Sequence, residues 1–271
     1  MLPYITLLGF HVQTYYVCAA LAGAAAMGLA YSNLRKARLG GWRYLLPLLL
    51  APSALVGARL LNYVLNPSAY GQEFRPWALS YRNLSLMGGL VAGVGALVLF
   101  AFCKRQSPWP LLDAMVLPGG AAIVLLKVGC FLNGCCIGRP TGGAFGMRFP
   151  ANEVIYDYLD TLPLLQAQNR TVHPTQLYEF SGAALGLCAI LPLMRRRRLP
   201  SGVGALLYAL WFTIVRLAVH PLRAFPYARF ITVTVYPVFY FSILILLSVV
   251  LTVIMRRQGQ RRAGAPSDKG R

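Results

Sequence analysis

The sequence predicts an all-α integral membrane protein with seven transmembrane helices, an outside N-terminus and a cytoplasmic C-terminus. The first observation is composition: 57% of the 271 residues are hydrophobic, 12% are charged and the mean hydropathy is +0.57. Soluble domains carry about 25% charged residues. The second observation is a series of apolar stretches, each near the ~20 residues that a helix needs to cross a bilayer. The third is the clustering of cations in alternate loops.

Seven apolar stretches are long enough to span a membrane. They lie near residues 13–31, 44–65, 84–103, 110–134, 174–194, 203–222 and 231–255. The chain therefore divides into a seven-helix membrane domain, 1–255, and a basic cytoplasmic tail, 256–271. The tail has no apolar period, so we expect it to be disordered. The longest outer segment, 138–173, is the best candidate for a small folded cap.

Cations in the short loops set the expected orientation, because lysine and arginine resist translocation. Three alternate loops and the tail carry most of them: Arg35, Lys36, Arg38, Arg43, Lys104, Arg105, Arg195 to Arg198, Arg256, Arg257, Arg261, Arg262, Lys269 and Arg271. The other loops hold the carboxylates Glu73, Glu153, Asp157 and Asp160 and should face outward. The net charge of +19 thus reflects topology and anionic lipid, and we expect no nucleic-acid partner.

Polar side chains interrupt the apolar stretches, and each is costly in hydrocarbon without a partner. The set is Arg59, Asp113, Lys127, Asn133, Glu179, Arg216, His220 and Arg223. The last three are spaced i, i+4 and i+7, so they share one helix face that should point into the bundle. Snorkelling from the helix end would also explain Arg223, but not the deeper Arg216. Convergence of Arg59, Lys127 and Arg216 would form a cationic pocket for a phospholipid head group.

Three cysteines lie in the segment 129–138, which ends the fourth stretch. Cys130, Cys135 and Cys136 cluster near Lys127 at the predicted outer end, where an oxidising compartment permits a disulfide. A metal site is the alternative, but the spacing lacks the Cys-x-x-Cys repeat or histidine pair of zinc sites. We rank a disulfide or a structural role above a metal, and we expect no metal and no cofactor. Packing roles are expected for the remaining cysteines, Cys18, Cys103 and Cys188.

Two further motifs open the third and fifth stretches. Glycines in Met87-Gly-Gly-Leu-Val-Ala-Gly93 let a neighbouring backbone or an acyl chain approach closely, and they also fit a small-xxx-small packing face. The second motif, His173-Pro-Thr-Gln-Leu-Tyr-Glu179, tolerates its proline in a first helical turn. It carries more polarity than a helix start needs, which indicates a functional site.

These motifs resemble those of the prolipoprotein diacylglyceryl transferases, the bacterial family that begins lipoprotein maturation. The family's fourth-span signature reads Gly-Arg-x-Gly-Asn-Phe-x-Asn-Gly-Glu-x-x-Gly, and this chain reads Leu126-Lys-Val-Gly-Cys-Phe-Leu-Asn-Gly-Cys-Cys-Ile-Gly138. The resemblance extends to seven spans with the N-terminus outside. It also covers the motif ending at Glu179 and matches at Tyr16, Gly57-Ala-Arg59, Asp113, Pro118, Arg216 and Arg223.

The chain departs from this family at positions that the family uses for chemistry. Met87 replaces a histidine, and a thioether cannot act as a general base. Lys127 replaces the signature arginine, Cys130 its first asparagine and Cys135 its glutamate. His220 replaces a glutamate between the two sixth-span arginines. The resemblance therefore implies retained anion binding and altered proton handling.

The resemblance implies transfer of a diacylglyceryl group from phosphatidylglycerol to a cysteine thiol, such as a prolipoprotein lipobox cysteine, with release of glycerol phosphate. Expected catalytic residues are Tyr16, Lys127, Asn133, Arg216 and His220, the last as a replacement base. Expected substrate-binding residues are Arg59, Gly88, Gly89, Gly138, Gln176, Tyr178, Glu179 and Arg223, and structural roles are expected for Asp113 and His173. A packed histidine at a helix end explains His220 about as well as a base does.

Three functions compete. A divergent phospholipid-dependent transferase of the bacterial cytoplasmic (inner) membrane ranks first, because the cationic residues and the motif ending at Glu179 persist. A non-catalytic lipid-binding homologue ranks second, favoured by Met87 and Cys135. A membrane thiol-redox protein that uses Cys130, Cys135 and Cys136 ranks last, since a Cys-x-x-Cys pair is missing.

Overall fold

The computed structural model describes residues 4–7, 9–35, 41–65, 84–149, 171–196, 199–225 and 227–263, together with Leu2 and Pro67. Within these residues, seven helices are long and apolar enough to cross a membrane, as the sequence predicts. Most of the loop 66–83, the central part of the predicted cap and residues 264–271 lie outside the described residues. So do several loop charges used above: Lys36, Arg38, Glu73, Glu153, Asp157, Asp160, Arg197, Arg198, Lys269 and Arg271.

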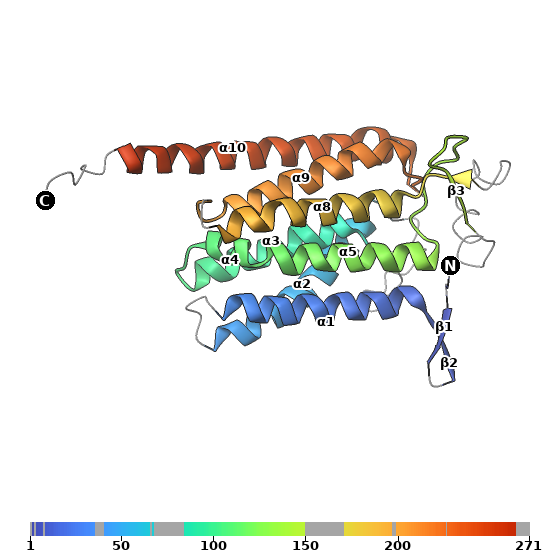
Figure 1. Ribbon diagram of the computed structural model, residues 1–271, viewed down its shortest axis with the longest axis horizontal. Coiled ribbons are helices and arrows are strands. Elements are labelled where there is room, and N and C mark those ends of the chain that lie inside the picture. The colour runs from blue at the N-terminus through green and yellow to red at the C-terminus, as the bar shows by residue number, and fades with distance from the viewer. Residues whose placement is uncertain are drawn as a thin grey trace, which may run out of the picture.

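The helices run side by side in one bundle (Figure 1). The first half of the chain supplies α1 (Thr14–Leu34), α2 (Trp42–Leu65), α3 (Leu86–Cys103), α4 (Pro108–Ala114) and α5 (Val116–Asn133). The second half supplies α8 (Thr175–Arg195), α9 (Val203–Val219), the 3-10 helix η3 (His220–Leu222), the π-helix η4 (Ile231–Val235) and α10 (Tyr236–Ala263). The last helix thus continues past 255, the boundary that the sequence suggested between span and tail.

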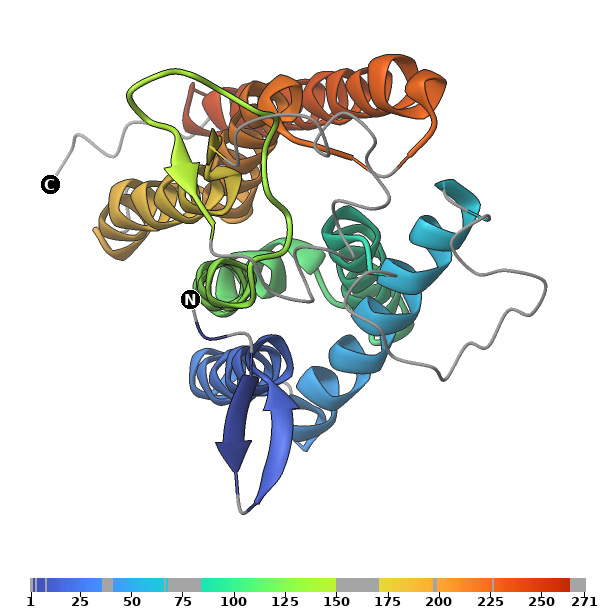
Figure 2. The same cartoon turned by 90° about the vertical axis from the view of Figure 1, so that its right-hand side faces the viewer.

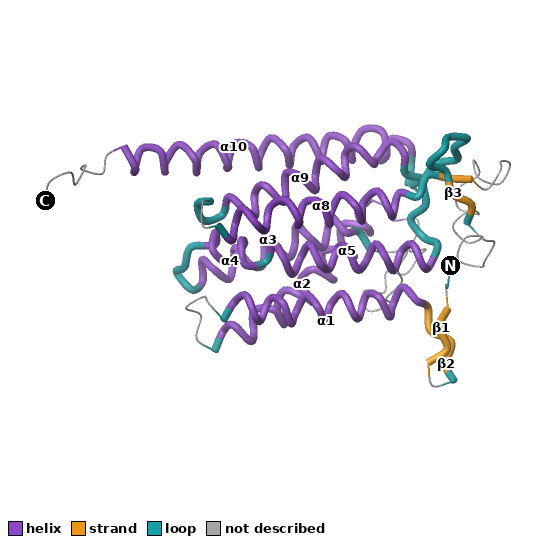
Figure 3. Tube along the Cα trace, in the orientation of Figure 1, coloured by secondary structure: helices purple, strands orange, loops and turns teal. Residues whose placement is uncertain are grey.

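Two short antiparallel strand pairs mark one end of the bundle, which we call the hairpin end after the first of them. They pair β1 (Tyr4–Leu7) with β2 (Phe10–Gln13) and β3 (Met147–Arg148) with β4 (Thr171–Val172). Figure 3 shows all the strands at this end, and the last helix runs to the opposite end. Viewed from the hairpin end in Figure 2, α5 lies between α1 on one side and α8 on the other, in agreement with the helix contacts.

One predicted span is built from two helices. The stretch 110–134 breaks at Met115, between α4 and α5, although the pair still forms a single span of membrane length. Pro118 has no N–H to donate to the Ala114 carbonyl one turn earlier. The Asn33 side chain of α1 donates to that carbonyl at 2.9 Å instead. A side chain from another helix therefore donates the hydrogen bond that the carbonyl of Ala114 cannot receive from Pro118.

The helices α2 and α3 pack backbone against backbone. A Cβ atom added at Gly88 would collide with the carbonyl oxygen of Gly57, and one added at Gly57 would lie 2.6 Å from the carbonyl oxygen of Gly88. Gly89 likewise faces the backbone of Ala54. Gly88 and Gly89 therefore have a helix-packing role, and their contact with substrate stays a prediction.

A short backbone ladder ties together the ends of α5, α8 and α9. The N–H of Gly138 donates to the His173 carbonyl at 2.9 Å, and the N–H of Arg139 donates to the Leu222 carbonyl at 2.8 Å. A Cβ atom at Gly138 would lie 2.6 Å from the first of these oxygens and 2.7 Å from the second. Any larger residue would push the strands apart, which explains the glycine at this position.

Candidate functional site

A buried carboxylate with three cations lies where α5, α8 and α9 meet near the hairpin end. Glu179 of α8 is 1% exposed and pairs with Lys127 of α5, Arg216 of α9 and Arg223, which follows η3. Arg216 Nη1 and Arg223 Nη1 lie 2.5 Å and 2.8 Å from Glu179 Oε1, while the Lys127 ammonium binds Oε2. We call these four residues the ion cluster.

The ion cluster carries an excess of positive charge. Three cations face one carboxylate, so its formal net charge is +2. Charges removed from water are costly unless they are compensated. A buried group of this sign therefore favours an anionic ligand, and the two planar guanidinium groups match phosphate geometry.

Tyr240 of α10 extends the ion cluster and was missed by the sequence analysis. Arg216 Nη2 donates to its hydroxyl at 3.0 Å, and the residue is fully buried. Met87 packs in the same hydrophobic core as Tyr240. Met87 therefore packs among apolar side chains next to the cluster. The sequence gives no distinct signal for Tyr240, because the last span also contains Tyr236.

His220 lies next to the ion cluster and makes a separate hydrogen bond. Its Nε2–H donates to the Thr232 carbonyl at 2.6 Å, and its ring packs against Phe225, Tyr236 and Tyr240. This bond fixes the tautomer, so Nδ1 keeps its lone pair when the ring is neutral. Nδ1 is buried and has no hydrogen-bond partner among the described side chains and backbone. The geometry is compatible with both earlier hypotheses, a base and a packed helix-end histidine.

The motif at the start of α8 positions the loop that follows α5. Gly134 ends α5 in the left-handed conformation, with φ of 78°. Gln176 Nε2 then donates to the Cys135 carbonyl, and Thr175 Oγ1 donates to the Cys136 carbonyl, each at 2.7 Å. The two motifs that the sequence singled out separately are thus in direct contact.

Asn133, the last residue of α5, is fully buried. Neither atom of its side-chain amide has a hydrogen-bond partner within the described part of the chain. Buried amides normally have such partners. This amide therefore offers a donor and an acceptor to a group that enters the site.

The remaining predicted residues lie on several elements. Arg59 is 5% exposed on α2, a helix that packs mainly on α3. Tyr16 is 37% exposed on α1, whereas its neighbour Tyr15 packs against the loop cysteines. Tyr178 and His173 interact through the hydroxyl and Nδ1 at 3.3 Å. Participation of Arg59, Tyr16 and Tyr178 in substrate binding stays a prediction.

Asp113 lies on α4, away from the ion cluster, and caps α9. Its Oδ2 accepts from the Gly202 N–H at 2.6 Å, and its Oδ1 accepts from the Ala205 N–H at 2.9 Å. Gly202 is the N-cap residue of α9 and Ala205 lies in its first turn, where N–H groups have no partner within the helix. Asp113 therefore stabilises the start of α9.

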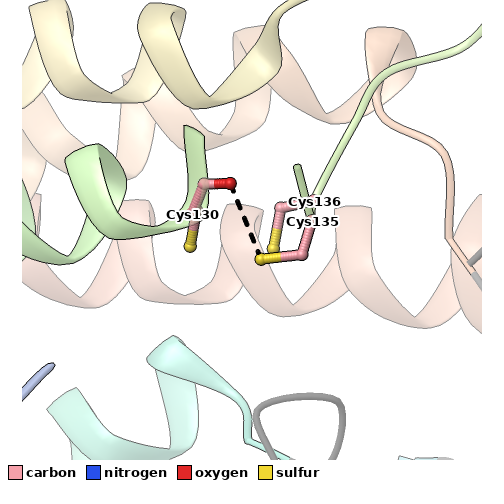
Figure 4. A group of neighbouring side chains, drawn as sticks. All are labelled: Cys130, Cys135 and Cys136. Atoms are coloured by element: carbon pink, nitrogen blue, oxygen red, sulfur yellow. Dashed lines mark hydrogen bonds between the residues drawn. The ribbon is translucent and has the colours of Figure 1, made fainter. Parts of the chain in front are cut away.

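Three cysteine sulfurs converge beside the ion cluster. Those of Cys130, Cys135 and Cys136 all lie within 4.8 Å of one another (Figure 4). All six cysteines are free thiols, so the disulfide considered above is not formed in this structure. The pKa of Cys136 is held well below its usual range. The main cause is hydrogen bonding from Cys130 and Cys135, and the positive charges of Arg223 and Lys127 add to it. Hydrogen bonds with the other two thiols raise the pKa of Cys135.

Seven membrane-length helices and a buried cationic cluster on three of them define a multi-pass membrane protein with a polar centre near one end of the bundle. The chain belongs to the prolipoprotein diacylglyceryl transferase family, whose model matches residues 3–256. It is therefore a member of an enzyme family of transferases.

Curated relatives carry the same description. The phosphatidylglycerol–prolipoprotein diacylglyceryl transferase of a Synechococcus strain is 28% identical over 220 residues, which cover 75% of this chain and 73% of that protein. The corresponding protein of Lactobacillus acidophilus is 29% identical over 217 residues, covering 78% and 75%. The one of Rhodopirellula baltica is 30% identical over 160 residues, covering 55% and 32%.

Proposed function

We propose that this protein moves the diacylglyceryl group of phosphatidylglycerol, or of a similar anionic phospholipid, to the lipobox cysteine of a prolipoprotein. In this reaction a carbon–sulfur bond forms, the carbon–oxygen bond to the phosphate breaks and glycerol phosphate leaves. The names of the relatives support the substrates. The ion cluster carries the proposal, because it is a buried cationic centre suited to a phosphate.

In the proposed reaction, the cations act on the leaving group. Negative charge grows on the phosphate oxygens as the carbon–oxygen bond breaks, and fixed positive charges stabilise that state more than the starting one. Arg216 and Arg223 supply guanidinium forks and Lys127 supplies a compact charge. Glu179 offsets repulsion among the three cations and holds them in one place. It thus positions the cations before substrate binds.

The proposed base is His220. A thiolate is the nucleophilic form of cysteine, so the acceptor thiol must lose its proton. Nδ1 of His220 keeps its lone pair in the neutral tautomer set by Thr232 and can take that proton. Met87, which stands where the family has a histidine, carries a thioether and cannot take this proton.

The proposed location is the bacterial cytoplasmic membrane, with the hairpin end and the N-terminus outside and the C-terminus inside. The cations Lys104, Arg105 and Arg195 support this orientation. They belong to the connection after α3 and to the end of α8, at the opposite end from the hairpins (Figure 1). The phosphate of an outer-leaflet lipid would then meet the ion cluster.

The test is a reconstituted transfer reaction. Purified protein is mixed with labelled phosphatidylglycerol and a lipobox peptide, and we expect a thioether-linked peptide and glycerol phosphate in equal amounts. Lys127→Met should abolish both products. The matched control is Lys104→Met, because Lys104 lies over the Trp42 ring and outside the ion cluster. This variant should still form both products. Bound lipid without any product in the wild type would refute the proposal.

The base is tested separately with His220→Gln. Its amide can still donate to the Thr232 carbonyl, but it cannot accept a proton at neutral pH. We expect transfer to fall by roughly 100-fold or more, within the range for loss of general base catalysis. Thermal unfolding should be nearly unchanged. A fully active variant would leave His220 as a packed helix-end histidine.

A further inference from the structure

Three thiols share one small volume beside the ion cluster without taking part in its salt bridges. Cys130 lies in the last turn of α5, whereas Cys135 and Cys136 follow the Gly134 turn. Their sulfurs all lie within 4.8 Å of one another (Figure 4). Three thiolates at about 2.3 Å from one metal ion would have sulfurs roughly 4 Å apart. Small side-chain movements would therefore bring all three sulfurs onto a single ion.

The surrounding chain holds these sulfurs in place. Cys136 adopts φ of 59°, a conformation that is uncommon for residues other than glycine. Gln176 and Thr175 fix the carbonyl groups of Cys135 and Cys136. Cys130 and Cys135 are 6% and 3% exposed. Cys136 is half-buried. The group is thus a largely buried and constrained set of donors, unlike isolated packing cysteines.

We propose that Cys130, Cys135 and Cys136 bind one thiophilic metal ion, and that Cu(I) fits best. Thiolate donors select Cu(I), zinc or iron–sulfur clusters. Structural zinc sites use four protein ligands, and the group has no fourth cysteine, histidine or carboxylate among the residues that the structure describes. Cu(I) is satisfied by three sulfurs. The positive charges of Lys127 and Arg223 act on this group and offset the negative charge of three thiolates around a monovalent ion.

The bound ion would link the end of α5 to the loop that follows it. This segment carries the family signature, and two of the thiols replace its asparagine and glutamate. The proposal does not depend on the transfer reaction, because it concerns only the three thiols and their ion.

The experiment is an anaerobic competition titration of the reduced, full-length protein in detergent with Cu(I) and the chelator bicinchoninate. We expect the protein to withdraw one equivalent of copper, and X-ray absorption should show three sulfur neighbours. Cys130→Asn and Cys135→Glu each restore the family's residue. Each should weaken binding by more than the roughly 10- to 100-fold typical of losing an outer-shell partner of a metal site. Thermal unfolding of both variants checks that they are folded.

Matched controls are Cys103→Ser and Cys188→Ser, which remove exposed thiols on other helices and should leave copper binding unchanged. Failure of the reduced wild type to withdraw copper would overturn the proposal, as would full binding by folded Cys130→Asn protein. Preference for zinc with a fourth neighbour in X-ray absorption would overturn the assignment of Cu(I). If the wild-type protein bound copper but transferred no lipid, the result would count against the proposed function and not against the copper site.

Discussion

Glu179 and Asp113 are carboxylates in the spans of the same bundle, and their partners are of different kinds. Asp113 accepts two hydrogen bonds from backbone N–H groups of Gly202 and Ala205, which leaves a satisfied helix cap. Glu179 binds three charged side chains from three segments, which leaves a net positive centre. Burial of a carboxylate therefore does not identify a functional site. The balance of charge around it separates the structural contact of Asp113 from the centre that we propose binds an anion.

The largest effect should follow from Glu179→Gln. This change keeps the shape of the side chain but leaves three cations without their shared counter-charge. Breaking a buried ion pair by removing one partner costs about 3–5 kcal/mol. We expect a lower unfolding temperature. We also expect the transfer rate to fall at least about 100-fold, which corresponds to about 2.7 kcal/mol of lost transition-state stabilisation. Both are measured on the purified variant by thermal unfolding and the peptide transfer reaction.

The comparison would break if Glu179→Gln transferred lipid at the wild-type rate. Glu179 would then resemble Asp113, as a buried carboxylate with a purely structural role. A stable but inactive variant would sharpen the comparison instead, because it would assign the carboxylate to the positioning of the cations.

A smaller loss is expected from Arg216→Lys. Lysine keeps the charge but cannot bind Glu179 and Tyr240 at once through a planar fork. A hydrogen bond to a charged group contributes about 1.5–3 kcal/mol, so transfer should fall by roughly 10- to 100-fold. Arg195→Lys makes the same change at an exposed position at the end of α8 and should have no effect. Equal activity of the two variants would show that charge alone suffices in the ion cluster.

A smaller effect again should come from Tyr240→Phe, which removes only the hydroxyl bound to Arg216. We expect transfer to fall by about tenfold, equivalent to about 1.4 kcal/mol. Tyr208→Phe is the matched control, because its hydroxyl donates to the Ala183 carbonyl at 3.4 Å, a neutral partner. If both variants kept full activity, Tyr240 would be a packing residue beside the cluster.

The sequence predicts the spans well because each depends on local hydropathy alone. It could not predict the break between α4 and α5. The carbonyl of Ala114 that is left open at this break accepts a hydrogen bond from Asn33 of α1, which lies 81 residues earlier in the chain. The role of Gly88 was also open, because its contact with Gly57 depends on how α2 and α3 cross. Long-range packing, which no local pattern encodes, decides both features.

The site was predictable where polar residues interrupt apolar spans. Lys127, Glu179, Arg216 and Arg223 were all singled out for that reason, although their arrangement around one carboxylate was not expected. Tyr240 escaped because tyrosine is ordinary in a membrane helix. The linear spacing of the cysteines did not predict that all three sulfurs meet at one point. The Gly134 turn brings Cys135 and Cys136 back to Cys130, and this turn cannot be read from the spacing.

The smallest effect should follow from Asp113→Asn. Asparagine keeps one acceptor for the first turn of α9 and loses the other, so the cost should lie near 1 kcal/mol, as for other helix caps. For a chain of this size, that lowers the unfolding temperature by roughly 2–4 °C. Transfer per folded molecule should be unchanged, because α9 still delivers Arg216 to Glu179 at its other end. If Asp113→Asn reduced transfer more than Tyr240→Phe without a matching loss of stability, the position of α9 would couple its two ends, and the cap would act on the ion cluster through the helix.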